Sequence, residues 1–124
     1  MQRVLIVDDS FSMRAMMGET LRNEGFEVVE AEDGVDALSK LGTALGNGPV
    51  DLIVTDLNMP VLDGIRLIEC VRREPEMKRT PILMLTTEGA EATKQQGKAA
   101  GATGWIKKPF DPDKLIATVA KVLK

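Results

Sequence analysis

The sequence predicts an α/β protein in which a doubly wound, five-stranded parallel sheet carries helices on both faces. Short runs of branched apolar residues alternate with segments in which apolar residues recur every three or four positions. The short runs are apolar throughout, which is typical of strands buried on both faces of a parallel sheet. Strands that alternate with helices along the chain are typical of this fold class.

The five strands are expected near residues 3–7, 27–31, 52–55, 82–85 and 104–106. The first, third and fourth hold the clearest apolar runs, among them Val4–Val7 and Ile82–Leu85. Runs of this length are too short for helices and are followed by polar residues, which favours strands.

The five helices are expected near residues 11–24, 34–45, 63–73, 90–100 and 111–123. The second and fifth show the clearest helical spacing of apolar side chains, at Val35, Leu38, Leu41 and Leu45 and at Leu115, Ile116, Val119, Val122 and Leu123. Asp63 and Asp111 are placed to cap the third and fifth helices. A turn is expected at 46–49, where two glycines and a proline follow the second helix.

The fourth helix differs from the others because residues 90–100 hold no large apolar side chain. Gly97 in its interior costs about 1 kcal/mol relative to alanine. With little to bury, this helix is expected to be the most easily displaced. It is either a loosely packed surface helix or a mobile element that responds to a change at the functional site, and the two interpretations are compatible.

The composition fits a single soluble globular domain. The 124 residues are 44% hydrophobic and 28% charged, and the net charge of −3 gives no basic surface for nucleic acid. The one cysteine, Cys70, cannot form an internal disulfide, which fits a reducing compartment. No apolar run approaches the length of a membrane span and no signal sequence precedes the first strand, so we expect a cytoplasmic protein without a membrane association.

After four of the predicted strands stand polar residues that could together form one site. Asp8–Asp9 follow the first strand, Asp56 the third, Thr86 the fourth and Lys107–Lys108 the fifth. Ligands of open α/β sheets bind beyond the carboxyl ends of the strands. Three acids, a hydroxyl and an ammonium at this edge suit a divalent cation together with a phosphoryl group.

The three acids, Asp8, Asp9 and Asp56, are the strongest part of this pattern. A single acid at a strand end often serves only as a cap or turn former, but three at matching strand ends repel one another unless a cation neutralises them. Oxygen ligands without His or Cys favour a hard cation, Mg²⁺ above all. The three residues are therefore the candidate ligands of Mg²⁺.

Five motifs span the chain in order: Val7-Asp8-Asp9-Ser10, Ala31–Leu38, Asp56–Gly64, Thr86 and Lys108-Pro109-Phe110. Together they resemble the motifs of a response-regulator receiver domain, most closely the stand-alone chemotaxis regulator of the CheY type. The resemblance implies a flavodoxin-like sheet with strand order 2-1-3-4-5, and one receiver domain over residues 1–124 with no output domain.

The resemblance also implies the roles of the acids. Asp56 would be the phosphoacceptor, whose carboxylate becomes an aspartyl phosphate. Asp8, Asp9 and Asp56 would bind Mg²⁺ together with the backbone carbonyl of Asn58, with Asp9 as a direct ligand and Asp8 acting through water.

Two further residues would contact the phosphoryl group. Thr86 would donate its hydroxyl to one phosphoryl oxygen, and Lys108 would pair with another as a compact charge. Lys108 is chosen over Lys107 because the family motif is Lys-Pro, and the family also suggests a cis Lys108–Pro109 bond.

The aromatic switch position of the family, three residues before Lys108, is Trp105 here, where the family often has Tyr or Phe. The alternative is that Trp105 is simply buried in the fifth strand. With Thr86 it forms the expected switch pair. The polar fourth helix is a second departure, since related chemotaxis regulators use apolar residues there for docking, and it leaves the output partner open.

Asn58 and Glu88 lie two residues beyond Asp56 and Thr86. At these positions they can flank the path of an attacking water, so they are expected to modulate dephosphorylation. Both match the chemotaxis-type pattern, which implies self-hydrolysis that is fast for the family.

These expectations describe a phosphorylation-dependent signalling switch rather than an enzyme. A histidine kinase would supply the phosphoryl group, because the chain contains no His. The expected output is the binding of a monomer to a partner, first of all the flagellar motor switch, with a phosphatase to end the signal. A single-domain phosphorelay shuttle is the alternative within the family.

Two alternatives come from other classes of protein. A Mg²⁺-dependent phosphatase with an Asp nucleophile would normally show a second acid two residues after it, where this chain has Asn58. A flavodoxin-like FMN carrier would have a loop rich in Ser, Thr and Gly after the first strand. Asp8 and Asp9 stand there instead and would repel a phosphate.

Overall fold

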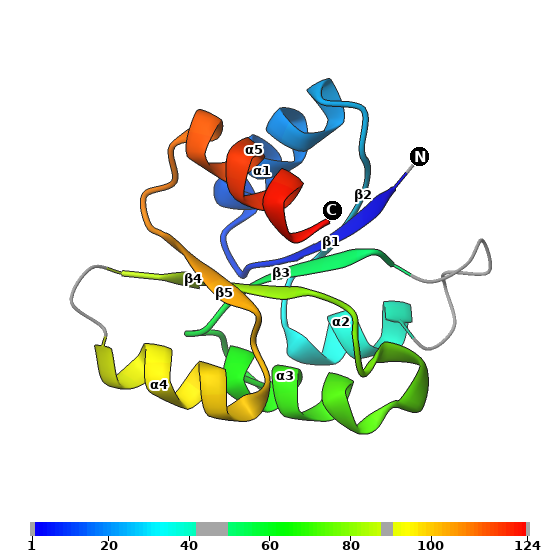
Figure 1. The fold of residues 1–124 in the computed structure, drawn as a ribbon, viewed down its shortest axis with the longest axis vertical. Coiled ribbons are helices and arrows are strands. Elements are labelled where there is room, and N and C mark those ends of the chain that lie inside the picture. Colours follow the sequence, from blue (N-terminus) through cyan, green and yellow to red (C-terminus); the bar gives the residue numbers. More distant parts are fainter. Residues whose placement is uncertain (1, 42–49, 88–90, 124) are drawn as a thin grey trace.

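The computed structural model describes residues 2–41, 50–87 and 91–123, and its five strands form one parallel sheet in the order β2-β1-β3-β4-β5 (Figure 1). The strands are β1 (Arg3–Val7), β2 (Glu27–Ala31), β3 (Leu52–Asp56), β4 (Ile82–Thr86) and β5 (Gly104–Lys107). The predicted fold class and strand order are confirmed.

Two layers of helices cover the sheet. The helices are α1 (Phe11–Asn23), α2 (Gly34–Ser39), α3 (Gly64–Arg73), α4 (Glu91–Ala100) and α5 (Pro112–Val122), and a short 3₁₀ helix, η2 (Pro75–Met77), follows α3. In Figure 1, α1 and α5 lie on one side of the sheet, and α2, α3 and α4 on the other.

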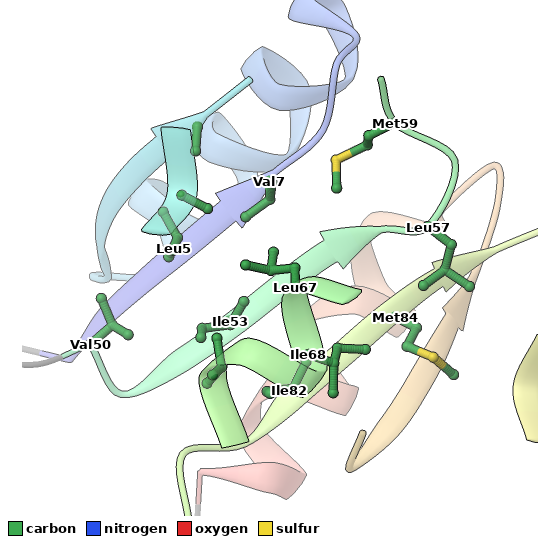
Figure 2. Close-up of a cluster of buried hydrophobic side chains, with 13 residues drawn as sticks. Leu5, Val7, Val50, Ile53, Leu57, Met59, Leu67, Ile68, Ile82 and Met84 are labelled. Carbon is green, nitrogen blue, oxygen red and sulfur yellow. The ribbon is translucent and has the colours of Figure 1, made fainter. Parts of the chain in front are cut away.

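The sheet is apolar on both faces because successive side chains of each strand point to opposite sides. Leu5 and Val7 of β1 belong to the core beneath α2 and α3, which Figure 2 shows. Val4 and Ile6 belong to the second core, where Leu115 of α5 is completely buried. The continuous apolar runs of the sequence are therefore strands buried on both faces.

The ends of the helices follow from local chemistry where the chain is described. The carboxylates of Asp63 and Asp111 accept hydrogen bonds from backbone N–H groups in the first turns of α3 and α5, at 2.9 and 3.0 Å, as predicted. The expected continuation of the second helix through 42–45 and the turn at 46–49 lie outside the described residues. Val35 is exposed rather than part of the buried stripe of α2.

At one residue, Gly97, α4 is not loosely packed as expected but lies close against the sheet. Gly97 is buried, and a Cβ at this position would lie 1.8 Å from the sulfur of Met84 on β4. The glycine lets the helix approach the sheet more closely than any other residue would allow.

Arg72 of α3 joins the far end of α4 to the loop before β4. Its guanidinium donates hydrogen bonds to the carbonyl oxygens of Gly101, Met77 and Thr80, at 2.9, 2.9 and 2.7 Å.

No helix within residues 2–41, 50–87 and 91–123 is long and apolar enough to cross a membrane.

Candidate functional site

The parallel sheet brings the polar strand ends together at one edge. β3 pairs with β1 on one side and with β4 on the other, and β4 pairs with β5. Asp56 is the last residue of β3 and Thr86 the last of β4, while Asp8 comes directly after β1. The carboxyl ends of four neighbouring strands therefore supply the candidate site, as predicted.

The three acids form a compact cluster. One carboxylate oxygen from each of Asp8, Asp9 and Asp56 lies within 4.8 Å of the others, with Asp8 and Asp56 buried and Asp9 exposed. The buried Asp8 Oδ2 accepts no hydrogen bond from the described residues. A set of oxygen ligands with an unsatisfied buried oxygen and one exposed carboxylate fits a hard divalent cation that keeps some of its water.

Lys108 provides the positive charge of the site. Its Nζ lies 3.0 Å from Asp56 Oδ2 and 3.6 Å from Asp8 Oδ2. The Lys108–Pro109 peptide is cis, as the resemblance implies, and the backbone N–H of Lys108 donates to the carbonyl of Thr86 at 2.6 Å. Of the two candidate lysines, Lys108 is therefore the one held against the acids.

The electrostatics of the cluster concentrate on Asp8, which has no solvent exposure. Burial raises the pKa of Asp8 above its ordinary value, and the charges of Asp56 and Asp9 raise it further. The N–H of Ser10, which donates to Asp8 Oδ1 at 2.8 Å, and the ammonium of Lys108 lower the pKa but do not offset the burial. An ionised Asp8 is therefore costly until a cation joins the cluster.

Asp56 is held in place from its own strand and from α3. Leu57 N–H donates to Asp56 Oδ1 at 2.8 Å, and the Thr55 hydroxyl donates to the Asp56 carbonyl at the same distance. Gly64, the first residue of α3, approaches so closely that a Cβ there would lie 2.2 Å from the Asp56 carbonyl oxygen. One carboxylate oxygen is thus fixed by the backbone, while the other faces Lys108.

Thr86 contributes a buried hydroxyl at the neighbouring strand end. The residue is only 3% exposed, and its Oγ1 has no hydrogen-bond partner among the described residues. Buried hydroxyls are usually satisfied, so an unpaired one at a strand end is a free donor for an anionic oxygen.

The remaining predicted residues lie around this centre. Trp105 is 47% exposed, so the alternative of an indole buried in the fifth strand is wrong, and Lys94 Nζ lies over its ring at 4.9 Å from the centroid. Asn58 is exposed in the loop after β3. Glu88 lies outside the described residues.

One residue that contacts the site was not singled out from the sequence. Arg14, in the first half of α1, donates a 2.6 Å hydrogen bond from Nη1 to the backbone carbonyl of Asp8. The sequence shows that Arg14 lies on the helix that Ser10 caps. It does not show which group the long side chain contacts, because that depends on the fold. An arginine one or two turns after a pair of acids is the only signal that was available.

Comparisons with known proteins agree with this geometry. The model of the family described as the response regulator receiver domain matches residues 4–120. The chain is 40% identical to chemotaxis protein CheY1 of Helicobacter pylori, over 98% of this chain and 96% of the relative. It is 39% identical to the chemotaxis protein CheY homolog of Campylobacter jejuni, over 98% of this chain and 92% of the relative. The solved structure of chemotaxis response regulator CheY4 of Vibrio cholerae superposes with a TM-score of 0.92 at 48% identity and covers 99% of both chains.

Proposed function

The chain belongs to the response regulator receiver domain family and is a phosphorylation-dependent chemotaxis response regulator, and we propose that Asp56 is the residue that accepts the phosphoryl group. The observation that carries this assignment is the position of Asp56. Its Oδ1 is held by a backbone N–H, while its Oδ2 lies 3.0 Å from Lys108 Nζ at the centre of the acid cluster.

The chemistry follows from these contacts. A carboxylate oxygen of Asp56 attacks phosphorus, the bond between phosphorus and the donor imidazole nitrogen breaks, and an acyl phosphate forms. Lys108 then pairs with a phosphoryl oxygen in place of the carboxylate, and the hydroxyl of Thr86 donates to another. Positioning and charge compensation at a fixed site are the main contributions that a protein makes to phosphoryl transfer.

We assign Mg²⁺ binding to Asp8, Asp9, Asp56 and the backbone carbonyl of Asn58. The ion would supply charge neutralisation for the acids and the phosphoryl oxygens. Asp9, the exposed member of the cluster, is the direct ligand in this assignment, and Asp8 acts through water.

The partners are proposed from the relatives, which are chemotaxis proteins by name. A histidine kinase supplies the phosphoryl group, since the chain has no His of its own. The phosphorylated protein binds an output partner, the flagellar motor switch, as a cytoplasmic monomer. It assists its own phosphorylation and dephosphorylation but converts no separate substrate. Asn58 and Glu88 modulate the hydrolysis of the acyl phosphate.

Labelling with a small phosphodonor tests the assignment. The wild-type protein, incubated with acetyl phosphate and Mg²⁺, should gain one phosphoryl group on Asp56 by mass spectrometry, and a chelator should prevent this. Asp56→Asn should remove the label, whereas Asp113→Asn, an exposed acid in the first turn of α5, should leave it intact. Labelling of Asp56→Asn at the normal rate would contradict the assignment.

The lifetime of the label separates two roles within the family. We expect the acyl phosphate to decay over seconds to minutes, as suits a chemotaxis signal. A lifetime of many hours would favour the phosphorelay shuttle, and turnover of a small phosphate ester would favour the Asp-nucleophile phosphatase.

A further inference from the structure

The peptide that joins Asp8 to Asp9 is held by a side chain from α1. The carbonyl oxygen of Asp8 belongs to this peptide, and Arg14 Nη1 donates to it at 2.6 Å. Because a peptide unit is planar, holding its carbonyl oxygen holds the orientation of the whole unit, including the direction of the bond from nitrogen to Cα of Asp9. The direction in which Asp9 leaves the backbone therefore depends on Arg14.

Arg14 is itself held by contacts with two neighbouring side chains. Its Nε lies 3.5 Å from Glu30 Oε1 at the end of β2, and the guanidinium lies 5.8 Å from the centroid of the Phe11 ring. The side chain is only 13% exposed. A guanidinium presents its donors in a rigid fork, so one arginine can hold a carbonyl and a carboxylate at the same time.

Asp9 has no comparable support of its own. Asp8 is fixed by its N–H bond to the Ala31 carbonyl at 3.1 Å and by the Ser10 N–H at its carboxylate. Within residues 2–41, 50–87 and 91–123, no hydrogen bond or ion pair is made by the exposed Asp9 side chain. Its carboxylate is positioned through the backbone, by the peptide that Arg14 holds.

We propose that Arg14 is a positioning residue of the Mg²⁺ site, which orients the Asp9 carboxylate by holding the Asp8–Asp9 peptide and is braced by Glu30. This inference rests on the metal site of the proposed function. It opposes the simplest electrostatic expectation, because a guanidinium near a cation site weakens cation binding by repulsion. Loss of the arginine should thus tighten Mg²⁺ binding if only its charge matters, and weaken it if positioning dominates.

The test is calorimetric titration of the full chain with Mg²⁺, without a phosphodonor. Arg14→Met removes the fork and the charge, and Arg14→Lys removes the fork but keeps the charge. We expect both variants to bind Mg²⁺ about tenfold more weakly, as is typical when a residue that orients a metal ligand is lost. Tighter or unchanged binding by Arg14→Met would overturn the proposal.

Arg22→Met is the matched control. Arg22 lies on the same helix and pairs with the same Glu30, at 3.2 Å, but its side chain is 50% exposed. Its loss should change the Mg²⁺ affinity by no more than about twofold, because an exposed ion pair contributes little energy. An equal loss in Arg14→Met and Arg22→Met would show that loosening of the Glu30 region is responsible and would also overturn the proposal.

Two further titrations, of other variants and of the wild-type protein, complete the test of the positioning role. If Arg14→Met does not fold, Arg14→Lys and Glu30→Gln carry the test, and full wild-type Mg²⁺ affinity in both would refute the positioning role. The wild-type titration tests the proposed function separately. A wild-type protein that binds no Mg²⁺ yet still folds would contradict the metal site itself and this inference with it.

Discussion

Gly97 of α4 lies so close to the side chain of Met84 on β4 that a Cβ at position 97 would stand 1.8 Å from the Met84 sulfur. Met84 is 1% exposed and belongs to the core beneath α3, so a methyl group at position 97 would have to displace its thioether within that core. The helix with the least apolar sequence is thus fitted to the sheet at its one glycine.

Replacing Gly97 with alanine should therefore destabilise the protein. Helix propensity favours alanine by about 1 kcal/mol, but overpacking a core typically costs about 1–3 kcal/mol. We expect a net loss of about 1 kcal/mol in the free energy of unfolding, measured by urea denaturation. In a Met84→Ala background the same change should be stabilising, because the truncated side chain leaves space for the new methyl group. An equal gain in both backgrounds would show that the contact is not tight.

Metal-free stability should decline as the pH rises through the titration of Asp8. Because burial raises the pKa of Asp8, the folded protein keeps this proton to a higher pH than the unfolded chain does. The contribution of Asp8 is fully present below its ordinary pKa of 3.8 and is lost as the pH rises through the raised folded value. Each unit of the shift corresponds to about 1.4 kcal/mol.

The difference between wild type and Asp8→Asn isolates this contribution from that of the other carboxylates. Without Mg²⁺, we expect Asp8→Asn to be the more stable protein at neutral pH, with the advantage shrinking as the pH approaches 3.8. Asp9→Asn should also melt higher than wild type in metal-free buffer while binding Mg²⁺ worse. A lower melting temperature of both variants at neutral pH, without metal, would mean that neither the burial of Asp8 nor repulsion within the cluster destabilises the metal-free fold.

Substitution of Val61 should stabilise the folded protein. Its φ of 71° lies in the left-handed region that β-branched residues avoid. The side chain is 81% exposed, so burial contributes little to its stability. Leu62 N–H donates to the Pro60 carbonyl at 2.8 Å across this residue, which defines a tight turn. Val61→Asn should raise the free energy of unfolding by about 1 kcal/mol, since asparagine is enriched among the non-glycine residues that adopt a positive φ.

Val35→Asn is the control for this substitution. Val35 is also exposed, at 52%, but lies in the first turn of α2, where no left-handed conformation is relieved. We expect no gain there in thermal melts. A similar gain at both positions would assign the effect to polarity rather than to backbone strain.

The fluorescence of Trp105 should report the switch rather than the metal. The indole is half-exposed beneath Lys94 in this structure, and phosphorylation should draw Thr86 toward the phosphoryl group and shift the population to an inward ring. Mg²⁺ alone should leave the emission nearly unchanged, whereas Mg²⁺ with beryllofluoride should change it. Thr86→Ala should abolish that change.

Lys94→Met extends this experiment to the contact that holds the ring outward. A cation over an indole is worth about 0.5–1 kcal/mol at an exposed site. Its loss should favour the inward ring before activation and so reduce the response to beryllofluoride. Equal responses of the wild-type protein to Mg²⁺ with and without beryllofluoride would show that Trp105 does not report switching.

The sequence was sufficient for those features that depend on local patterns. Apolar runs predicted the first, third and fourth strands most clearly, and the polar residues that follow strands predicted which side chains meet at the sheet edge. Helix caps such as Asp63 were also predictable, because a cap acts within three residues of itself.

The features that sequence analysis missed depend on contacts between distant elements. The effect of Gly97 on stability depends on which side chain of β4 lies beneath it. The role of Arg14 depends on the direction of the Asp8 carbonyl. The outward position of Trp105 reflects a contact with α4. None of these leaves a periodic signal, so composition alone described α4 as weak.

The hydrogen bonds of Arg72 have a mechanical consequence for α4. They tie the turn at Gly101, directly after the last residue of the helix, to the segment before β4. A rod fixed at one end moves most at the other, so we expect α4 to tilt about Gly101, with its first turn travelling furthest. The first turn of α4 is also the part of the helix that follows Thr86 in the chain, so we expect a displacement of Thr86 to move that turn more than the end at Gly101.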